Sequence, residues 1–251
     1  MIPVKSAADL ACMREACALT GEVLDHVEAL VAPGVTTEEL DRAVESFIRK
    51  RGATPSFKGY NGFPKSACIS VNEEVIHGIP GGKRLQRGDI VSVDVGAYLK
   101  GFHGDAARTF PVGEADAASL RLIAVTRACF YAGLAAVKAG ARLGDVSGAV
   151  QRTAEDAGFS VVREYVGHGV GRELHEDPEV PNVGTPGRGT RLYEGMTLAI
   201  EPMINAGGRA IRVLPNNWTV VTQDGKRSAH YENTVLVTQS GGEILTATAK
   251  P

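Results

Sequence analysis

The chain has 251 residues, of which 43% are hydrophobic and 22% are charged, and its formal net charge is −2. This composition is typical of a globular protein with a sizeable core, and it excludes the polybasic surface of a general nucleic-acid or anionic-membrane binder. The four cysteines form no CxxC pair, and the chain shows neither a signal-peptide core nor a roughly 18-residue apolar run, so we expect reduced thiols, a cytoplasmic location and no membrane span.

Two helices are predicted at the start of the chain. Residues 6–31 and residues 36–52 carry apolar side chains at helical spacing, and each stretch begins with a capping-box pattern. Gly52 is a typical stop for the second helix. Three strand-like segments follow, at residues 67–71, 89–99 and 106–110.

The same order of elements begins again after residue 113. Helices are predicted at residues 115–140 and 143–158, and strand-like segments follow at 161–167, 195–204, 218–222 and 232–238. Residues 31–52 align without gaps on residues 137–158 at an offset of 106, with glycines shared at both helix boundaries. Any two amphipathic helices can look alike, but the shared glycines favour a duplicated unit.

We therefore predict an α+β fold in a single domain that spans residues 1–251. Two pseudo-symmetric halves, about 6–113 and 114–251, would pack their helices on a curved antiparallel sheet. Binding and catalytic sites often form between such halves.

Four strand segments contain an acid where an apolar residue is expected, namely Asp94, Asp105, Glu201 and Glu232. His168, between two glycines, joins this set. A single such acid is most simply a solvated strand position or one half of an ion pair. Several buried carboxylates together would repel one another unless cations neutralise them.

Four carboxylates and one imidazole can hold two divalent ions, with two acids bridging and the others binding terminally. Bridged ions about 3.5–4 Å apart can share one water, bring its pKa towards neutrality and polarise a carbonyl. A set rich in oxygen with one nitrogen suits Mn, Fe(II), Co or Zn, and it argues against a structural zinc site of the cysteine type.

The order and spacing of these residues resemble the ligand set of the methionine aminopeptidases, metallopeptidases with the pita-bread fold. Four stretches are similar to signatures of that family: "NGFPKSACISVNEEVIHGIP" (61–80), "KGFHGDAARTF" (100–110), "YVGHGVGRELHEDP" (165–178) and "EGMTLAIEPM" (194–203). The likeness extends from about residue 3 to residue 248. The short chain, without a large insertion between Glu201 and Glu232, resembles the type I, bacterial-like form.

The resemblance implies a single catalytic domain with two divalent ions, drawn from Co, Mn, Fe(II), Zn and Ni. Asp94 would bind one ion terminally, Asp105 and Glu232 would bridge both, and His168 and Glu201 would complete the second. A metal-bridged hydroxide would attack the scissile carbonyl, and Glu201 would act as general base.

The resemblance also assigns substrate contacts. His77 would contact the scissile amide near its nitrogen, and His175 would hydrogen-bond the oxyanion. The methionine pocket would be lined by Tyr60, Phe63, Cys68, His77 and Trp218. The plainer interpretations are loop histidines and core aromatics.

Two positions depart from the usual bacterial pattern of the family. Phe57 stands where a small residue is frequent, and Leu174 stands where an aromatic is common. Both bear on the volume of the pocket and on the preference for the second residue.

By family likeness, the free α-amine of the substrate would bind at the Asp94 end of the site. The enzyme would then be an exopeptidase that removes initiator methionine from nascent proteins and peptides, with a preference for a small second residue. The family further implies a cytoplasmic monomer that acts near the ribosome, with no specific binding of nucleic acid and no membrane association.

Three other interpretations remain open at this point. Proline-directed peptidases share the fold, but they usually carry a separate N-terminal domain, whereas the first helix here is predicted within the first ten residues. A binding module of the same fold should lack some ligands and carry a basic charge. A structural protein with salt-bridged acids would be insensitive to chelators.

Overall fold

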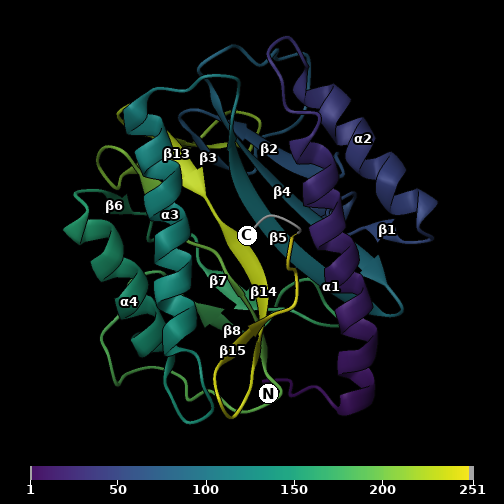
Figure 1. Cartoon of the computed structure of the whole chain (residues 1–251), viewed down its shortest axis with the longest axis vertical. Coiled ribbons are helices and arrows are strands. Elements are labelled where there is room, and N and C mark those ends of the chain that lie inside the picture. The colour runs from purple at the N-terminus through teal and green to yellow at the C-terminus, as the bar shows by residue number, and fades with distance from the viewer. Residues whose placement is uncertain (1, 249–251) are drawn as a thin grey trace.

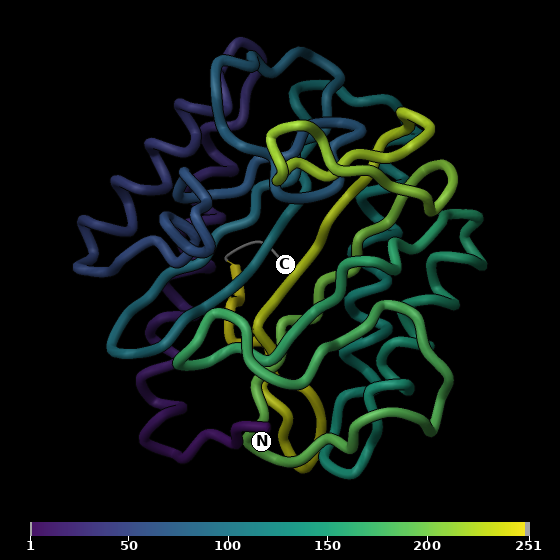
Figure 2. Tube along the Cα trace, turned by 180° about the vertical axis from the view of Figure 1, so that it is seen from behind, coloured from purple at the N-terminus to yellow at the C-terminus, as the bar shows by residue number. Residues whose placement is uncertain are grey.

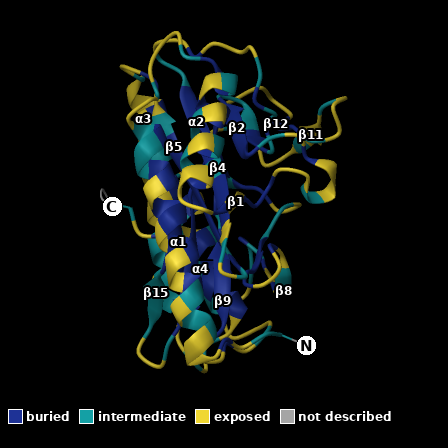
Figure 3. Ribbon diagram, turned by 90° about the vertical axis from the view of Figure 1, so that its right-hand side faces the viewer, coloured by how far each residue is buried: buried dark blue, intermediate teal, exposed yellow. Residues whose placement is uncertain are grey.

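The computed structural model describes residues 2–248. Its centre is a nine-stranded sheet in the order β1-β4-β5-β14-β9-β7-β8, with β2 paired to β4 and β15 paired to β14. Figure 1 shows the helices on one face of this sheet: α1 (Ala7–Glu28), α2 (Thr37–Lys50), α3 (Ala117–Ala136) and α4 (Leu143–Asp156). In the side view of Figure 3 the buried strands lie between these helices and a layer of loops and short strands.

All strand pairs of the three sheets in the described chain are antiparallel. The large sheet contains β1 (Thr54–Pro55), β2 (Ala67–Val71), β4 (Ile90–Leu99), β5 (Phe102–Pro111), β7 (Gly167–Gly169), β8 (Glu176–Val180), β9 (Thr197–Ile200), β14 (Glu232–Val237) and β15 (Gly242–Ile244). Two smaller sheets contain β6 (Ser160–Val161), β10 (Met203–Asn205) and β13 (Ser228–His230), and β3 (Glu74–Ile76), β11 (Ile211–Val213) and β12 (Val220–Thr222).

The observed elements differ from the predicted ones mainly in the strands. The predicted strand at 161–167 is wrong as a single element, because only its ends belong to β6 and β7. The predicted strand at 195–204 breaks after Ile200, since Pro202 has no N–H with which to continue the ladder. Strand β5 begins at Phe102, earlier than predicted.

The earlier start of β5 follows from a two-residue turn. Lys100 and Gly101 both have positive φ values, of 52° and 85°, as a type I′ hairpin requires. The turn lets Leu99 pair directly with Phe102, so the β4–β5 ladder is continuous.

The two helical pairs have matching local geometry. Helix α4 and strand β6 follow α2 and β1 at the same offset of 106 residues. Gly34 and Gly140 share that offset, and both have a φ of 92°. In Figure 2 the first half, purple to blue, and the second half, green, lie on either side of β14, drawn in yellow.

By length and composition alone, α3 is apolar enough to cross a membrane, which the sequence analysis did not anticipate. Within the fold its Leu122, Cys129 and Phe130 are fully buried. Gly133 brings its backbone close to Val150 of α4. The helix therefore packs one of its faces into the fold.

Candidate metal centre and active site

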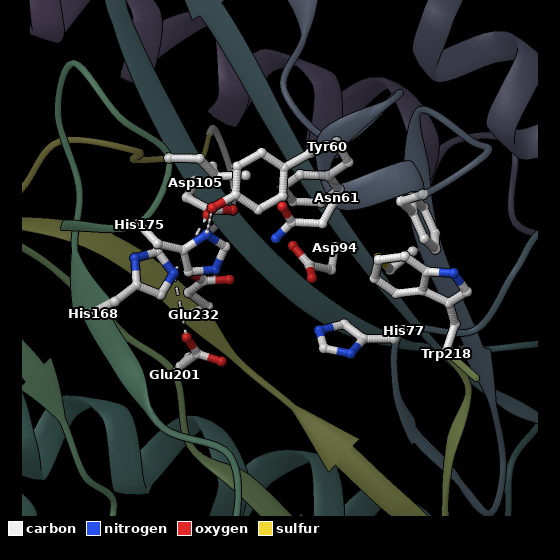
Figure 4. Close-up of a pocket in the computed structure, with 14 residues that line it drawn as sticks. Tyr60, Asn61, His77, Asp94, Asp105, His168, His175, Glu201, Trp218 and Glu232 are labelled. Carbon is white, nitrogen blue, oxygen red and sulfur yellow. Dashed lines mark hydrogen bonds and ion pairs between the residues drawn. The ribbon is translucent and has the colours of Figure 1, made fainter. Parts of the chain in front are cut away.

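The structure brings the five predicted ligands to one face of the large sheet (Figure 4). Four come from its strands, and the fifth, Glu201, directly follows β9. Asp94 on β4 and Glu232 on β14 are both cross-strand partners of Ala107 on β5. Asp105 precedes Ala107 by two residues and thus faces the same side. The small Ala107 leaves the space between the three carboxylates open.

The other two ligands come from the second half of the chain. Ile200 at the end of β9 pairs with Asn233, so Glu201, the next residue, lies beside Glu232. His168 on β7 pairs with Ala199, two residues before Glu201, and both therefore face the same side. Glu201 itself lies just outside β9, where the strand had been expected to continue.

Glycines on both sides of His168 let β7 pack tightly. A Cβ at Gly167 would lie 2.2 Å from the Ala199 carbonyl oxygen, and one at Gly169 would lie 2.3 Å from that of Asp177. The His168 Nδ1–H donates to the Gly169 carbonyl at 2.8 Å. This bond places the Nε2 lone pair towards the acids, as metal-binding histidines require.

The distances fit a divalent cation. His168 Nε2 lies 3.6 Å from Glu201 Oε1 and 3.7 Å from Asp105 Oδ2. One ligand atom each from Asp105, His168 and Glu232 lies within 4.8 Å of the others. Two atoms bound to one ion at about 2.0–2.2 Å are themselves about 3–3.6 Å apart, so only small adjustments are needed.

The electrostatics of the acids also call for cations. Burial raises the pKa of Asp94 to about 8. Burial, reinforced by repulsion from neighbouring carboxylates, raises the pKa values of Asp105, Glu201 and Glu232 well above their usual range. Asp94 Oδ1 and Asp105 Oδ1 are buried without a hydrogen-bond partner in the described chain. Divalent ions would satisfy both oxygens and stabilise the charged forms.

The acids form one end of a cavity of about 230 Å³, and its other end is apolar. There Phe57, Phe63, Cys68 and Leu174 form one buried cluster, against which Tyr60 and Trp218 pack. The cavity is smaller than the roughly 300–1,000 Å³ of sites for drug-sized ligands, and it suits a single side chain.

The two departures from the family pattern both lie in this wall. Phe57 packs against Gly96, where a Cβ would lie 2.9 Å from the Phe57 ring. Leu174 is fully buried on the same cluster. Together they set the volume of the apolar end.

The predicted substrate histidines stand on two sides of the cavity (Figure 4). His77 has a φ of 56°, an uncommon value for a non-glycine residue. His175 Nδ1 lies 2.9 Å from the Tyr60 hydroxyl. Burial lowers the pKa of His175, and burial with repulsion from His175 lowers that of His77 to about 4. Both rings are therefore neutral at pH 7.

Arg108 is a buried cation near the acids that was not among the predicted site residues. Arg108 donates to the Glu232 carbonyl oxygen at 2.5 Å and to Asn233 Oδ1 at 2.7 Å. Its positive charge lowers the pKa of Glu232, against the larger effect of burial. An arginine inside a largely buried strand was the available signal.

A buried ion pair ties the start of the chain to the loop that carries His175. Lys5 Nζ contacts Glu176 Oε2, and the two side chains are only 5% and 8% exposed. Glu176 Oε1 also accepts the Arg172 N–H at 2.8 Å. The pair therefore holds the loop against the N-terminal segment.

We expect Lys5→Met to destabilise the protein by about 3–5 kcal/mol, because the Glu176 charge would remain buried without its partner. Chemical denaturation monitored by circular dichroism measures this loss. Lys100→Met, which breaks the exposed pair with Glu15, is the matched control and should have a much smaller effect. Equal losses in the two variants would contradict the prediction.

Comparison with known proteins decides the family. The model of metallopeptidase family M24 matches residues 11–239, most of the chain. The chain belongs to metallopeptidase family M24. It is 52% identical to methionine aminopeptidase 1 of Bacillus subtilis, over 98% of this chain and 99% of that protein. This relative places the M24 chain with the methionine aminopeptidases and confirms the resemblance seen in its motifs.

Solved structures of related proteins have the same fold as this chain. The methionine aminopeptidase of Thermotoga maritima superposes on this M24 chain with a TM-score of 0.96 at 48% identity, covering 98% of this chain and 99% of its own. The prolidase of Pyrococcus furiosus is 23% identical to this chain and superposes on it with a TM-score of 0.81. The superposition covers 98% of this chain and 66% of the prolidase. It shows the fold alone. The predicted α+β pita-bread fold is thus confirmed.

Proposed function

We propose that this chain is a metal-dependent exopeptidase that removes the initiator methionine from peptides and nascent proteins. The observation that carries this proposal is the single cavity in which five metal-type ligands face an apolar end. A methionine side chain fits the apolar end, and the peptide bond that follows this methionine then lies at the acids. The similarity to methionine aminopeptidases supports the same substrate.

We propose two divalent ions as the cofactor. Five side chains would hold them: Asp94, Asp105, His168, Glu201 and Glu232. Divalent ions held there would lower the pKa of a bound water and polarise the scissile carbonyl.

The side chains around the metal centre supply the proton transfers. Glu201 accepts the proton of the attacking water and returns it to the departing amine. When the Tyr60 hydroxyl donates to His175 Nδ1, the proton of that ring is on Nε2, which can donate to the carbonyl oxygen as it gains charge. His77, from the opposite side, is placed for the scissile amide.

Selectivity would come from both ends of the cavity. Phe57, Phe63, Cys68, Leu174 and Trp218 exclude water from the side chain of the first residue. The free α-amine would bind at the Asp94 end, which restricts cleavage to the first peptide bond. The preference for a small second residue is proposed from family likeness.

We also propose the wider setting of the enzyme. The four cysteines are free thiols, which suits the cytoplasm, where nascent chains emerge near the ribosome. The enzyme would be a monomer with one catalytic domain over residues 1–251. The matching geometry of α2 and α4 supports its division into the halves 6–113 and 114–251.

A formylated substrate tests the role of the amine. Metal-loaded enzyme should cleave Met-Ala-Ser, and formyl-Met-Ala-Ser should lose roughly 10³-fold or more in kcat/KM, because the formyl group removes the basic nitrogen and leaves its polar partners unmatched. Released methionine is quantified by chromatography. The apoprotein with each divalent metal added in turn identifies the active ion. Equal turnover of the two peptides would refute the amine contact.

A further inference from the structure

His230, the last residue of β13, lies beside the metal centre without belonging to the predicted ligand set. Its side chain is buried, at 2% exposure, and its Nε2 has no hydrogen-bond partner in the described chain. The atom that faces it is Glu201 Oε2, at 3.7 Å. A buried polar nitrogen without a partner is rare in proteins, so this juxtaposition requires an explanation.

The two oxygens of Glu201 have different neighbours. Oε1 faces His168 Nε2 at 3.6 Å, on the side of the metal centre. Oε2 faces His230 Nε2 instead, at 3.7 Å. The carboxylate is thus placed between one histidine that belongs to the ligand set and one that does not.

The backbones that carry both side chains are anchored. The His230 N–H donates to Thr109 Oγ1 at 2.9 Å, and the Thr109 hydroxyl donates to the His230 carbonyl at 2.8 Å. Asn182 Nδ2 donates to the Glu201 carbonyl at 3.0 Å. Only a small side-chain movement is then needed to bring Nε2 and Oε2 within hydrogen-bond distance.

We propose that His230 is a positioning residue whose Nε2–H donates to Glu201 Oε2 and so fixes the orientation in which Oε1 faces the metal centre. The donor exists both in the imidazolium and in one neutral tautomer. Outer hydrogen bonds of this kind orient metal-binding side chains and strengthen metal binding. The inference deepens the proposed function and rests on it.

Three substitutions separate the hydrogen bond from packing. His230→Gln places an amide nitrogen near the position of Nε2, whereas the shorter His230→Asn reaches only to the position of Nδ1. His230→Leu keeps an apolar side chain of similar size. We expect the Asn and Leu variants to bind Mn²⁺ roughly 10–100-fold more weakly than the wild type in calorimetric titrations of the apoproteins, and the Gln variant to bind within about fivefold of it.

Activity gives the second readout. In metal-saturated enzyme, kcat for Met-Ala-Ser should fall in the Asn and Leu variants while KM changes little, because Glu201 acts on the water and not on substrate binding. His26→Leu, a histidine stacked on Phe47 away from the site, is the control and should match the wild type. Thermal melting of each apoprotein verifies folding.

Two results would overturn the inference. Wild-type Mn²⁺ affinity and kcat in His230→Leu would show that no hydrogen bond from this ring matters. A Gln variant as defective as the Leu variant would show that the ring acts through its shape. Failure of the wild type to cleave Met-Ala-Ser would instead count against the proposed function, and the metal titrations would still test the role of His230.

Discussion

Replacing Glu201 by alanine is expected to lower kcat/KM for Met-Ala-Ser by roughly 10³-fold or more without unfolding the chain. The variant loses the proton acceptor beside the attacking water, a contribution of about 10²–10⁴-fold in enzymes. It also loses one ligand of the metal centre. His168→Ala should have a comparable effect, because Nε2 of that ring faces both Glu201 and Asp105. Steady-state assays at saturating metal measure both variants.

Stability distinguishes this loss from misfolding. Without cations, the buried carboxylates repel one another, and this repulsion contributes to the raised pKa of Glu232. Removing Glu201 should leave the Tm of the apoprotein equal to or above that of the wild type, as is common when strained active-site charges are removed. Glu179→Ala, an exposed acid on β8, is the matched control and should retain full activity. Full activity in metal-loaded Glu201→Ala would refute the role of Glu201 as proton acceptor and metal ligand.

The candidate ligands could be proposed from the sequence because four acids stand in strand-like segments where apolar residues are expected. The tight hairpin at Lys100 and Gly101 was not expected, because the second strand was predicted only from residue 106, and the register of β4 and β5 is therefore a finding of the structure. In that register Asp94 and Asp105 face the same side. The acids and His168 then matched the family pattern in type and order.

Contacts between segments far apart in the chain could not be predicted in this way. Nothing in the local pattern around His230 shows that β13 brings it to Glu201, because that contact depends on the pairing of β13 with β10. The same holds for Arg108, whose partners lie on β14. The strand expected at 195–204 was wrong because apolar residues continue past Pro202, and hydropathy alone hides the break.

Removal of metal should abolish activity and lower stability, and the loss of stability should grow as the pH rises. Apoprotein prepared with a chelator should be inactive on Met-Ala-Ser, and Mn²⁺ at 100 times its Kd should restore cleavage and add about 2.7 kcal/mol of stability. Because the ligands bind metal in their deprotonated forms, the gap in Tm between metal-loaded protein and apoprotein should widen as the pH rises from 5 to 8.

The stability of the apoprotein itself should fall as the pH rises, and the raised pKa of Asp94 sets the direction of this change. The pKa of Asp94 is about 8 in the folded state, against 3.8 for the ordinary side chain. A group with a raised folded pKa stabilises the fold fully below its unfolded pKa, and that contribution is lost as the pH rises through the folded pKa. The Tm of the apoprotein should therefore fall between pH 5 and pH 8. Asp94→Asn cannot ionise at this position, so its apoprotein should lose less stability over the same range. Differential scanning calorimetry of the two apoproteins measures this difference, which includes the effect of the Asp94 charge on the pKa values of the neighbouring carboxylates. If the Tm of the two apoproteins fell in parallel with pH, Asp94 would already be ionised in the folded protein, and burial would not raise its pKa.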